Sequence, residues 1–210
     1  IDNTPPTTTD NSDVEWHGVG YALTLSPLDM LSGVSTTYYE ITGSEPTQLS
    51  PSGSQVTFGQ TGNYTVKYFS VDNAQNVESI KTASNTVLID ATQPVITVIT
   101  PSTNFISPLE PLVFNFSAID EHSGISEVRA YLDGVEVSNG ASVDLPDEFK
   151  YYNFTVIAID NVGNTAEYFL NFSTGLILRG EEQFKVTPEV LNVNPGVITG
   201  HVNFPAPFTG

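Results

Sequence analysis

A pair of aspartate-containing turns occurs twice in this chain, about ninety residues apart, and this period constrains the fold more than any other feature. The four turns begin at Asp29 and Asp72 in the first copy and at Asp120 and Asp160 in the second. The offset is 91 residues for the first turn and 88 for the second, and a Thr-x-Pro sequence also returns after 88 residues. A fixed period with matched signals predicts an array of similar domains.

The length of the chain agrees with that period. Its 210 residues suffice for about two domains of ordinary size. We therefore expect one domain in residues 1–90 (repeat 1), a second in residues 91–174 (repeat 2), and a shorter β segment in residues 175–210. The last segment reads as a linker followed by two strands. It is either the start of a third β domain or a tail that adds strands to a sheet edge.

Alternating apolar residues predict that both repeats consist of strands. In residues 112–120, for example, Phe114, Phe116 and Ala118 would face a core while Asn115 and Ser117 point outward. Asp133-Gly134 predicts a type I′ hairpin. Further strands are expected at 20–26, 36–41, 63–72 and 86–90 in repeat 1, and at 95–99, 127–132, 151–160 and 167–173 in repeat 2. Strands at this spacing without helices between them predict an all-β chain of antiparallel sandwiches.

Two strings make the expectation more specific. Residues 62–78, which include Gly62-Asn63-Tyr64-Thr65-Val66 and Ser70-Val71-Asp72-Asn73-Ala74, and residues 158–164, Ala158-Ile159-Asp160-Asn161-Val162-Gly163-Asn164, resemble the bacterial immunoglobulin-like repeats found in tandem in secreted and cell-surface proteins. Gln75 stands where such repeats usually carry Gly. The resemblance covers about 170 residues and implies tandem immunoglobulin-like sandwiches and an extracellular or cell-surface location. Such modules serve as spacers, adhesins, filament subunits and accessory domains, so their function has to be argued from sites.

The acidic balance excludes several partners. Twenty-four acidic side chains against six basic ones give a net charge of -18, and the excess is spread over both repeats. Nucleic acids and anionic membrane surfaces need neutralising Lys and Arg, so neither is an expected partner. No run of 18 apolar residues is present, so membrane insertion of this segment is not expected. Solubility, binding of divalent cations and self-repulsion of an extended array remain as explanations of the charge.

Topology predicts where the aspartates meet. In an immunoglobulin-type sandwich both Asp turns and the incoming linker lie at one pole, and for repeat 2 the linker residue is Asp90. Oxygen-only ligands suit Ca²⁺. We therefore predict a calcium site at the joint between the repeats, formed by Asp90, Asp120, Glu121, Asp160 and Asn161. Asp29 and Asp72, together with Asp2 and Asn3, would form the equivalent set in repeat 1. The alternative is that these side chains only accept hydrogen bonds from their own turns.

Other features leave further alternatives open. Tyr38-Tyr39 and Tyr151-Tyr152 should each place one ring in the core and one outside, where it could stack on a sugar or contact a protein partner. Four Asn-x-Ser/Thr sequons occur, a number close to that expected by chance, and we expect the one at Asn115 to point outward. The three His residues have no partner at a motif spacing, and no phosphate-binding loop or nucleophile elbow is present, so no enzymatic activity is expected.

Together these features predict a non-enzymatic structural or adhesive module of an extracellular surface protein or filament. Its partners would be neighbouring domains or subunits of a surface assembly, with a carbohydrate or protein ligand as a further partner. The competing hypothesis is an accessory region, either a spacer or a carbohydrate-binding one, of a larger secreted hydrolase.

Overall fold

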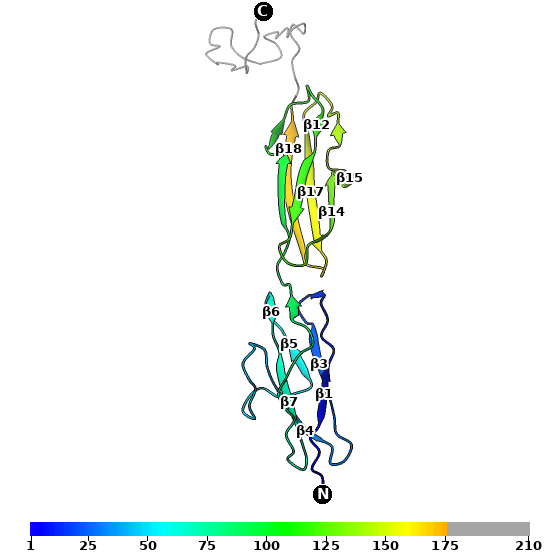
Figure 1. Ribbon diagram of the computed structural model, residues 1–210. Coiled ribbons are helices and arrows are strands. Elements are labelled where there is room, and N and C mark those ends of the chain that lie inside the picture. The colour runs from blue at the N-terminus through cyan, green and yellow to red at the C-terminus, as the bar shows by residue number, and fades with distance from the viewer. Residues whose placement is uncertain (176–210) are drawn as a thin grey trace, which may run out of the picture.

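Two β-sandwiches joined end to end make up the described part of the protein, which is residues 1–175 of a computed structural model (Figure 1). Every helix or strand assigned in these residues is a β-strand, so the predicted all-β class with tandem immunoglobulin-like sandwiches is confirmed for them. No helix in residues 1–175 has the length and apolarity needed to cross a bilayer. The predicted C-terminal β segment, residues 175–210, lies outside the described residues except for Gly175.

Repeat 1 contains nine strands. One sheet has the order β1-β3-β5, and the opposite side is formed by β4-β7-β8 and β2-β9-β6. The strands are β1 (Thr7–Asp10), β2 (Trp16–His17), β3 (Ala22–Leu28), β4 (Val34–Glu40), β5 (Gln55–Thr57), β6 (Gly62–Tyr64), β7 (Lys67–Asp72), β8 (Lys81–Thr82) and β9 (Val87–Ile89).

Repeat 2 also contains nine strands. A five-stranded sheet of order β11-β18-β17-β14-β15 packs against the pairs β10-β13 and β12-β16. The strands are β10 (Val95–Thr100), β11 (Phe105–Ile106), β12 (Leu112–Val113), β13 (Asn115–Ile119), β14 (Ile125–Leu132), β15 (Val135–Val137), β16 (Ser142–Val143), β17 (Lys150–Asp160) and β18 (Thr165–Thr174).

The apolar alternation seen in the sequence supplies a separate core in each repeat. In β17 every second side chain from Tyr152 onward is buried, and Tyr152, Phe154 and Val156 pack with Phe114 in the core of repeat 2. In repeat 1, Leu23 and Leu25 of β3 belong to a second cluster that contains no residue of repeat 2. Since neither core shares a residue with the other, each sandwich buries its own apolar surface.

Each predicted strand overlaps an observed one, but 63–72 divides into β6 and β7, and 112–120 divides into β12 and β13. Asp133 and Gly134 form the expected hairpin between β14 and β15. Their φ angles are 50° and 80°, which are the positive values that a type I′ turn requires. Two parallel pairs were not predicted: β2 runs parallel to β9, and β11 runs parallel to β18. The rest of the strand pairing is antiparallel. Strands of two residues carry too little periodicity to be found in the sequence.

The two tyrosine pairs differ in their exposure. In repeat 2 the prediction is confirmed, since Tyr152 is 5% exposed and Tyr151 is 72% exposed. In repeat 1 it is wrong. Tyr39 packs against the core, while Tyr38 is half-buried because it stacks on Phe69 at 5.2 Å between ring centroids and forms a β-bridge with Ser52. The chain between β4 and β5 thus covers a surface that stays open in repeat 2.

Candidate metal centre at the joint between the repeats

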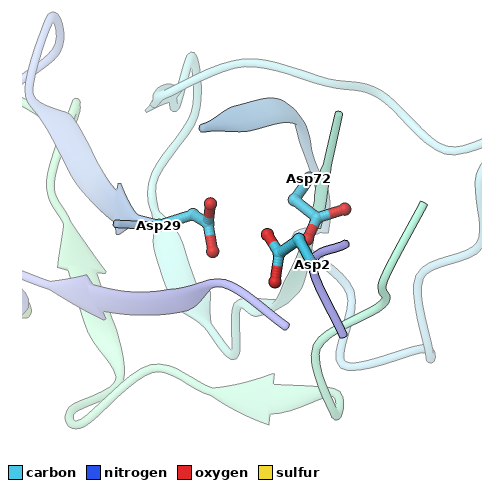
Figure 2. A group of neighbouring side chains, drawn as sticks. All are labelled: Asp2, Asp29 and Asp72. Carbon is cyan, nitrogen blue, oxygen red and sulfur yellow. The ribbon is translucent and has the colours of Figure 1, made fainter. Parts of the chain in front are cut away.

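Two groups of three aspartates stand at equivalent places in the two repeats. Asp90, Asp120 and Asp160 form one group, and Asp2, Asp29 and Asp72 form the other. Within each group one carboxylate oxygen per residue lies within 4.8 Å of the others. Figure 2 shows the carboxylates of Asp2, Asp29 and Asp72 facing one another from separate segments of the chain. Asp90, Asp72 and Asp160 are buried, and the other three are half-buried.

We call Asp90, Asp120 and Asp160 the joint group. Asp90 is its linker residue, and both carboxylate oxygens of Asp90 accept hydrogen bonds. Oδ1 accepts from the amide of Thr92 at 2.9 Å and from its hydroxyl at 2.6 Å. Oδ2 accepts from the amide of Ser123 at 3.1 Å and from its hydroxyl at 2.6 Å. Asp90 therefore fastens the linker to the Ser123-Gly124 turn of repeat 2.

Asp120 and Asp160 organise the turns in which they lie. Oδ1 of Asp120 accepts from the amides of His122 and Gly124, both at 3.0 Å, and within residues 1–175 its Oδ2 accepts no hydrogen bond. Asp160 Oδ1 accepts from the amides of Val162 and Asn164, and Oδ2 accepts from the Asn164 side chain at 2.7 Å. The expected turn hydrogen bonds are thus present, and they leave carboxylate oxygens facing a common point.

The same hydrogen bonds recur in the group of repeat 1. Asp2 accepts from the amides of Thr4 and Ser32. Asp29 accepts from the amides of Leu31 and Gly33. The side chain of Asn76 donates to Asp72 at 2.7 Å, as that of Asn164 does to Asp160, and each also donates to the carbonyl of its linker residue, Asp2 or Asp90, at 3.3 Å. Each repeat therefore carries one complete copy of this pole.

Gln75 does not change the shape of its turn. Its φ is 69°, in the left-handed region that the equivalent Gly163 occupies with a φ of 93°. In both repeats the amide of this residue donates to the carbonyl of the preceding Asp, at 3.2 Å in repeat 1 and 3.4 Å in repeat 2. Since a side chain is strained at such angles, repeat 1 keeps the turn at some cost in backbone energy.

Repeat 1 reaches the joint through the two residues of β2 and through Thr61, which precedes β6. The carbonyl of His17 accepts from the amide of Asp90 at 2.9 Å, and the hydroxyl of Thr61 accepts from the amide of Ala91 at 2.8 Å. The ring of Trp16 meets that of His122 edge-on, at 5.5 Å between centroids. These few contacts leave the linker, with Asp90 inside it, as the main connection between the sandwiches.

The joint group concentrates negative charge without a basic partner. Within residues 1–175 no Lys or Arg forms an ion pair with any of the six aspartates, because the ion pairs found there involve other acids. Burial alone would raise the pKa of Asp90, but the hydrogen bonds from Ser123 and Thr92 outweigh it and lower that pKa to about 2. Asp90 is therefore an anion at neutral pH, at a place where two further carboxylates converge.

This shifted pKa predicts how stability depends on pH. Because the pKa of Asp90 is lower in the folded chain than in the unfolded chain, it should contribute about 2 kcal/mol to the free energy of unfolding above about pH 4. The contribution should be lost as the pH falls through about 2. Urea unfolding of the parent and of Asp90→Asn, in chelator between about pH 6 and pH 2, measures it. A stability difference that stays constant on acidification would contradict the assignment.

Glu121 and Asn161 were also predicted as ligands. Glu121 is exposed and belongs to neither group. The side-chain nitrogen of Asn161 donates to the carbonyl of Ser123 at 2.6 Å, which leaves its oxygen as the atom that can approach a cation. The sequence interpretation missed the hydroxyls of Thr92 and Ser123 on Asp90, and the amide of Asn164. The repeated Thr-x-Pro sequence contains Thr92 and was therefore a signal for the Thr92 hydroxyl. In the sequence analysis it indicated only the length of the repeat.

Comparisons with known proteins add little to this geometry. No family model and no curated protein matches the chain. Among solved structures, the fibronectin(III)-like modules of Clostridium thermocellum CbhA align over 86% of this chain and 100% of theirs, at 16% identity and a TM-score of 0.37. The protocadherin gammaB7 EC3-6 cis-dimer structure aligns over 85% of this chain and 52% of its own, at 12% identity and a TM-score of 0.37. The chain thus spans about half the length of that protocadherin fragment.

Proposed function

We propose that the chain is a non-enzymatic structural or adhesive module of an extracellular surface protein or filament, with Ca²⁺ stiffening the joint between its repeats. The observation that supports this most is the convergence of Asp90, Asp120 and Asp160, within 4.8 Å of one another and without a basic partner in residues 1–175. Like charges held this close repel, and a divalent cation would remove the repulsion.

The donor atoms favour Ca²⁺ over other metals. Every side chain of the two groups offers a carboxylate oxygen, and hard oxygen ligands suit Ca²⁺ and Mg²⁺ rather than the metals that prefer imidazole or thiolate. Ca²⁺ accepts irregular shells of roughly six to eight oxygens, whereas Mg²⁺ demands near-octahedral geometry. Asp90, Asp120 and Asp160 would hold the ion at the joint, joined by the oxygen of Asn161, by Glu121 after a side-chain rotation, and by water. Asp2, Asp29 and Asp72 would hold an equivalent ion.

The position of Asp90 explains why an ion here would stiffen the joint. Its amide donates to His17 of repeat 1, while its carboxylate faces Asp120 and Asp160 of repeat 2. An ion bound by all three carboxylates would fix the linker against the pole of repeat 2. The linker backbone, held on its other side by repeat 1, would then lose its freedom to bend. A stiff series of sandwiches suits a spacer or a surface filament.

A calorimetric titration of the chain with CaCl₂ tests the proposal. We expect two binding events for the parent, one per group, and only one for Asp120→Asn. This variant keeps an oxygen to accept from the amides of His122 and Gly124, so its turn should stay intact. Asp133→Asn, which changes an exposed Asp of the β14–β15 hairpin, is the charge-matched control and should retain both events. No heat of binding for the parent at millimolar Ca²⁺ would refute the calcium site.

A further inference from the structure

The exposed aromatic side chains of the described chain gather in one place. Four aromatic residues in residues 1–175 are exposed, and all four belong to repeat 2: Phe105 (59%), Phe149 (63%), Tyr151 (72%) and Phe169 (61%). Phe149 meets the ring of Tyr151 edge-on at 5.0 Å between centroids. Exposed aromatic rings that collect on one surface often mark a binding site.

Strand register places Phe105, Tyr151 and Phe169 on the outer face of the five-stranded sheet. Phe105 of β11 and Tyr151 of β17 both pair with Ser173 of β18, so the two rings flank that residue on one face. Two outward-facing positions further along β17, at Thr155, a second pair of aromatic residues lies on either side. Phe169 of β18 and Tyr131 of β14 both pair with Thr155. Paired residues share a face, and neighbouring strands lie about 4.8 Å apart, so the backbone positions that carry the two rings of each row are roughly 10 Å apart.

Between the two aromatic rows lies a pair of amides. Asn153 and Asn171 are directly opposite each other in β17 and β18, both are exposed, and the nitrogen of Asn153 donates to the oxygen of Asn171 at 3.0 Å. Successive outward residues are roughly 7 Å apart along a strand, so the rows of rings are separated by about 13 Å. We call the six residues the aromatic face: Phe105, Tyr131, Tyr151, Asn153, Phe169 and Asn171.

Charge limits what this face can bind. None of its six residues is charged, and the basic side chains nearest to it along the strands are already paired. Arg129 lies 2.6 Å from Glu127, and Lys150 lies 3.5 Å from Asp133. A polyanion would therefore meet no unpaired basic side chain among the described residues next to this face, and the net charge of -18 would repel it. A second copy of the chain would bring the same net negative charge.

Repeat 1 provides an internal comparison. Phe69 and Val71 of β7 take the places of Ile157 and Ile159 on the outer face of β17, yet both are almost fully buried. Tyr38 stacks on Phe69, and the segment before β5 pairs with β4, so the chain covers this face itself. Repeat 2 instead leaves its aromatic rings open to solvent.

From these observations we infer that the aromatic face of repeat 2 binds a neutral polysaccharide, whose pyranose rings stack on the aromatic side chains. The apolar C–H faces of such rings match the aromatic side chains, and their hydroxyls match the Asn153–Asn171 pair. The frame of roughly 10 by 13 Å suits several sugar units of an extended chain rather than one small molecule. This inference does not depend on the calcium sites, which lie at the poles of the sandwiches.

A binding assay on the full chain tests the inference. The protein is made in a host without N-linked glycosylation, because Asn153 and Asn171 both stand in Asn-x-Ser/Thr sequons. It is assayed against cellulose, chitin, xylan, mannan and a mixed-linkage glucan, with alginate and pectin as anionic comparisons. We expect retention by at least one neutral polymer, unaffected by chelator, and none by the anionic ones.

Variants connect that retention to the face. Tyr151→Ala and Phe169→Ala should each weaken binding by about tenfold, and the double variant should abolish it, while Tyr151→Trp should preserve it. Leu49→Ala changes a residue of repeat 1 that is 98% exposed and should have no effect. The inference is overturned if the parent binds none of the neutral polymers, or if the alanine variants bind as the parent does. Sedimentation showing self-association that Tyr151→Ala abolishes would overturn it in favour of a second copy.

Discussion

Replacing Glu78 with Ala is expected to lower the free energy of unfolding of repeat 1 by about 3 to 4 kcal/mol, because it breaks a buried charged network. Glu78 accepts from the amide and hydroxyl of Thr8, at 2.8 and 2.7 Å, and from the amide of Ser70 at 3.2 Å. It also pairs with Lys81 at 2.6 Å. Without the carboxylate, the buried amides of Thr8 and Ser70 lose their side-chain acceptor.

Repeat 2 shows how the same place can be filled without charge. Strand register gives an equivalent residue in repeat 2 for each member of this network. The equivalents of Thr8, Thr37, Ser70 and Glu78 are, in that order, Ile96, Val128, Ala158 and Ala166. The fourfold variant Thr8→Val, Thr37→Val, Ser70→Ala, Glu78→Ala removes the three hydroxyls together with the carboxylate, and leaves the amides of Thr8 and Ser70 as the backbone donors that lose this acceptor. It should therefore be more stable than Glu78→Ala alone and lie within about 2 kcal/mol of the parent.

Urea unfolding followed by Trp16 fluorescence measures both variants. Trp16 is the single tryptophan of the chain and belongs to repeat 1, so it reports on the sandwich that carries the substitutions. Glu45→Ala removes an exposed acid of the same repeat and should change the stability by no more than about 0.5 kcal/mol. A Glu78→Ala variant as stable as this control, or a fourfold variant weaker than Glu78→Ala, would show that the network does not stabilise the fold.

The second large effect concerns the joint. Calcium should reverse the order of stability of the parent and the Asp120→Asn variant. In Ca²⁺ at about a hundred times its dissociation constant, binding should stabilise repeat 2 of the parent by about 2.7 kcal/mol, and Asp120→Asn should lose most of this. In chelator, Asp120→Asn should be at least as stable as the parent, because it removes one of three converging negative charges.

Thermal unfolding monitored by circular dichroism, in Ca²⁺ and in chelator, provides that comparison. Asp133→Asn lowers the charge of repeat 2 equally at an exposed hairpin and should follow the parent in both conditions. If the parent and Asp120→Asn kept the same order with and without Ca²⁺, the aspartates of the joint would serve only to hold their turns.

Much of this arrangement could be predicted from the sequence because its signals are local. Alternation places Phe154 in the core, and Asp133-Gly134 determines a hairpin through backbone angles alone. The convergence of Asp90, Asp120 and Asp160 followed from topology, since an immunoglobulin-type sandwich brings two turns and the linker to one pole. Their role as metal ligands remains a prediction.

What the sequence did not reveal depends on contacts between distant segments. Glu78 reads as an ordinary surface acid, and only its approach to Thr8 of β1 makes it a buried one. One ring of the Tyr38-Tyr39 pair was expected outside by strand alternation, but a bridge between Tyr38 and Ser52 brings another segment over it. Likewise Phe105 lies on the same face as Tyr151 only because a two-residue parallel strand places Phe105 beside Ser173.

The most direct test of the account is the distance distribution between the two repeats, with and without calcium. The chain has no cysteine, so Leu49→Cys and Val135→Cys introduce a single pair of exposed attachment sites for spin labels, one on each repeat. Pulsed electron–electron double resonance should give a broad distribution of label-to-label distances for the parent in chelator, and this distribution should narrow in Ca²⁺. For Asp120→Asn the distance distribution should stay broad in both conditions. A distribution whose width does not change when the parent binds Ca²⁺ would contradict a cation-stiffened joint.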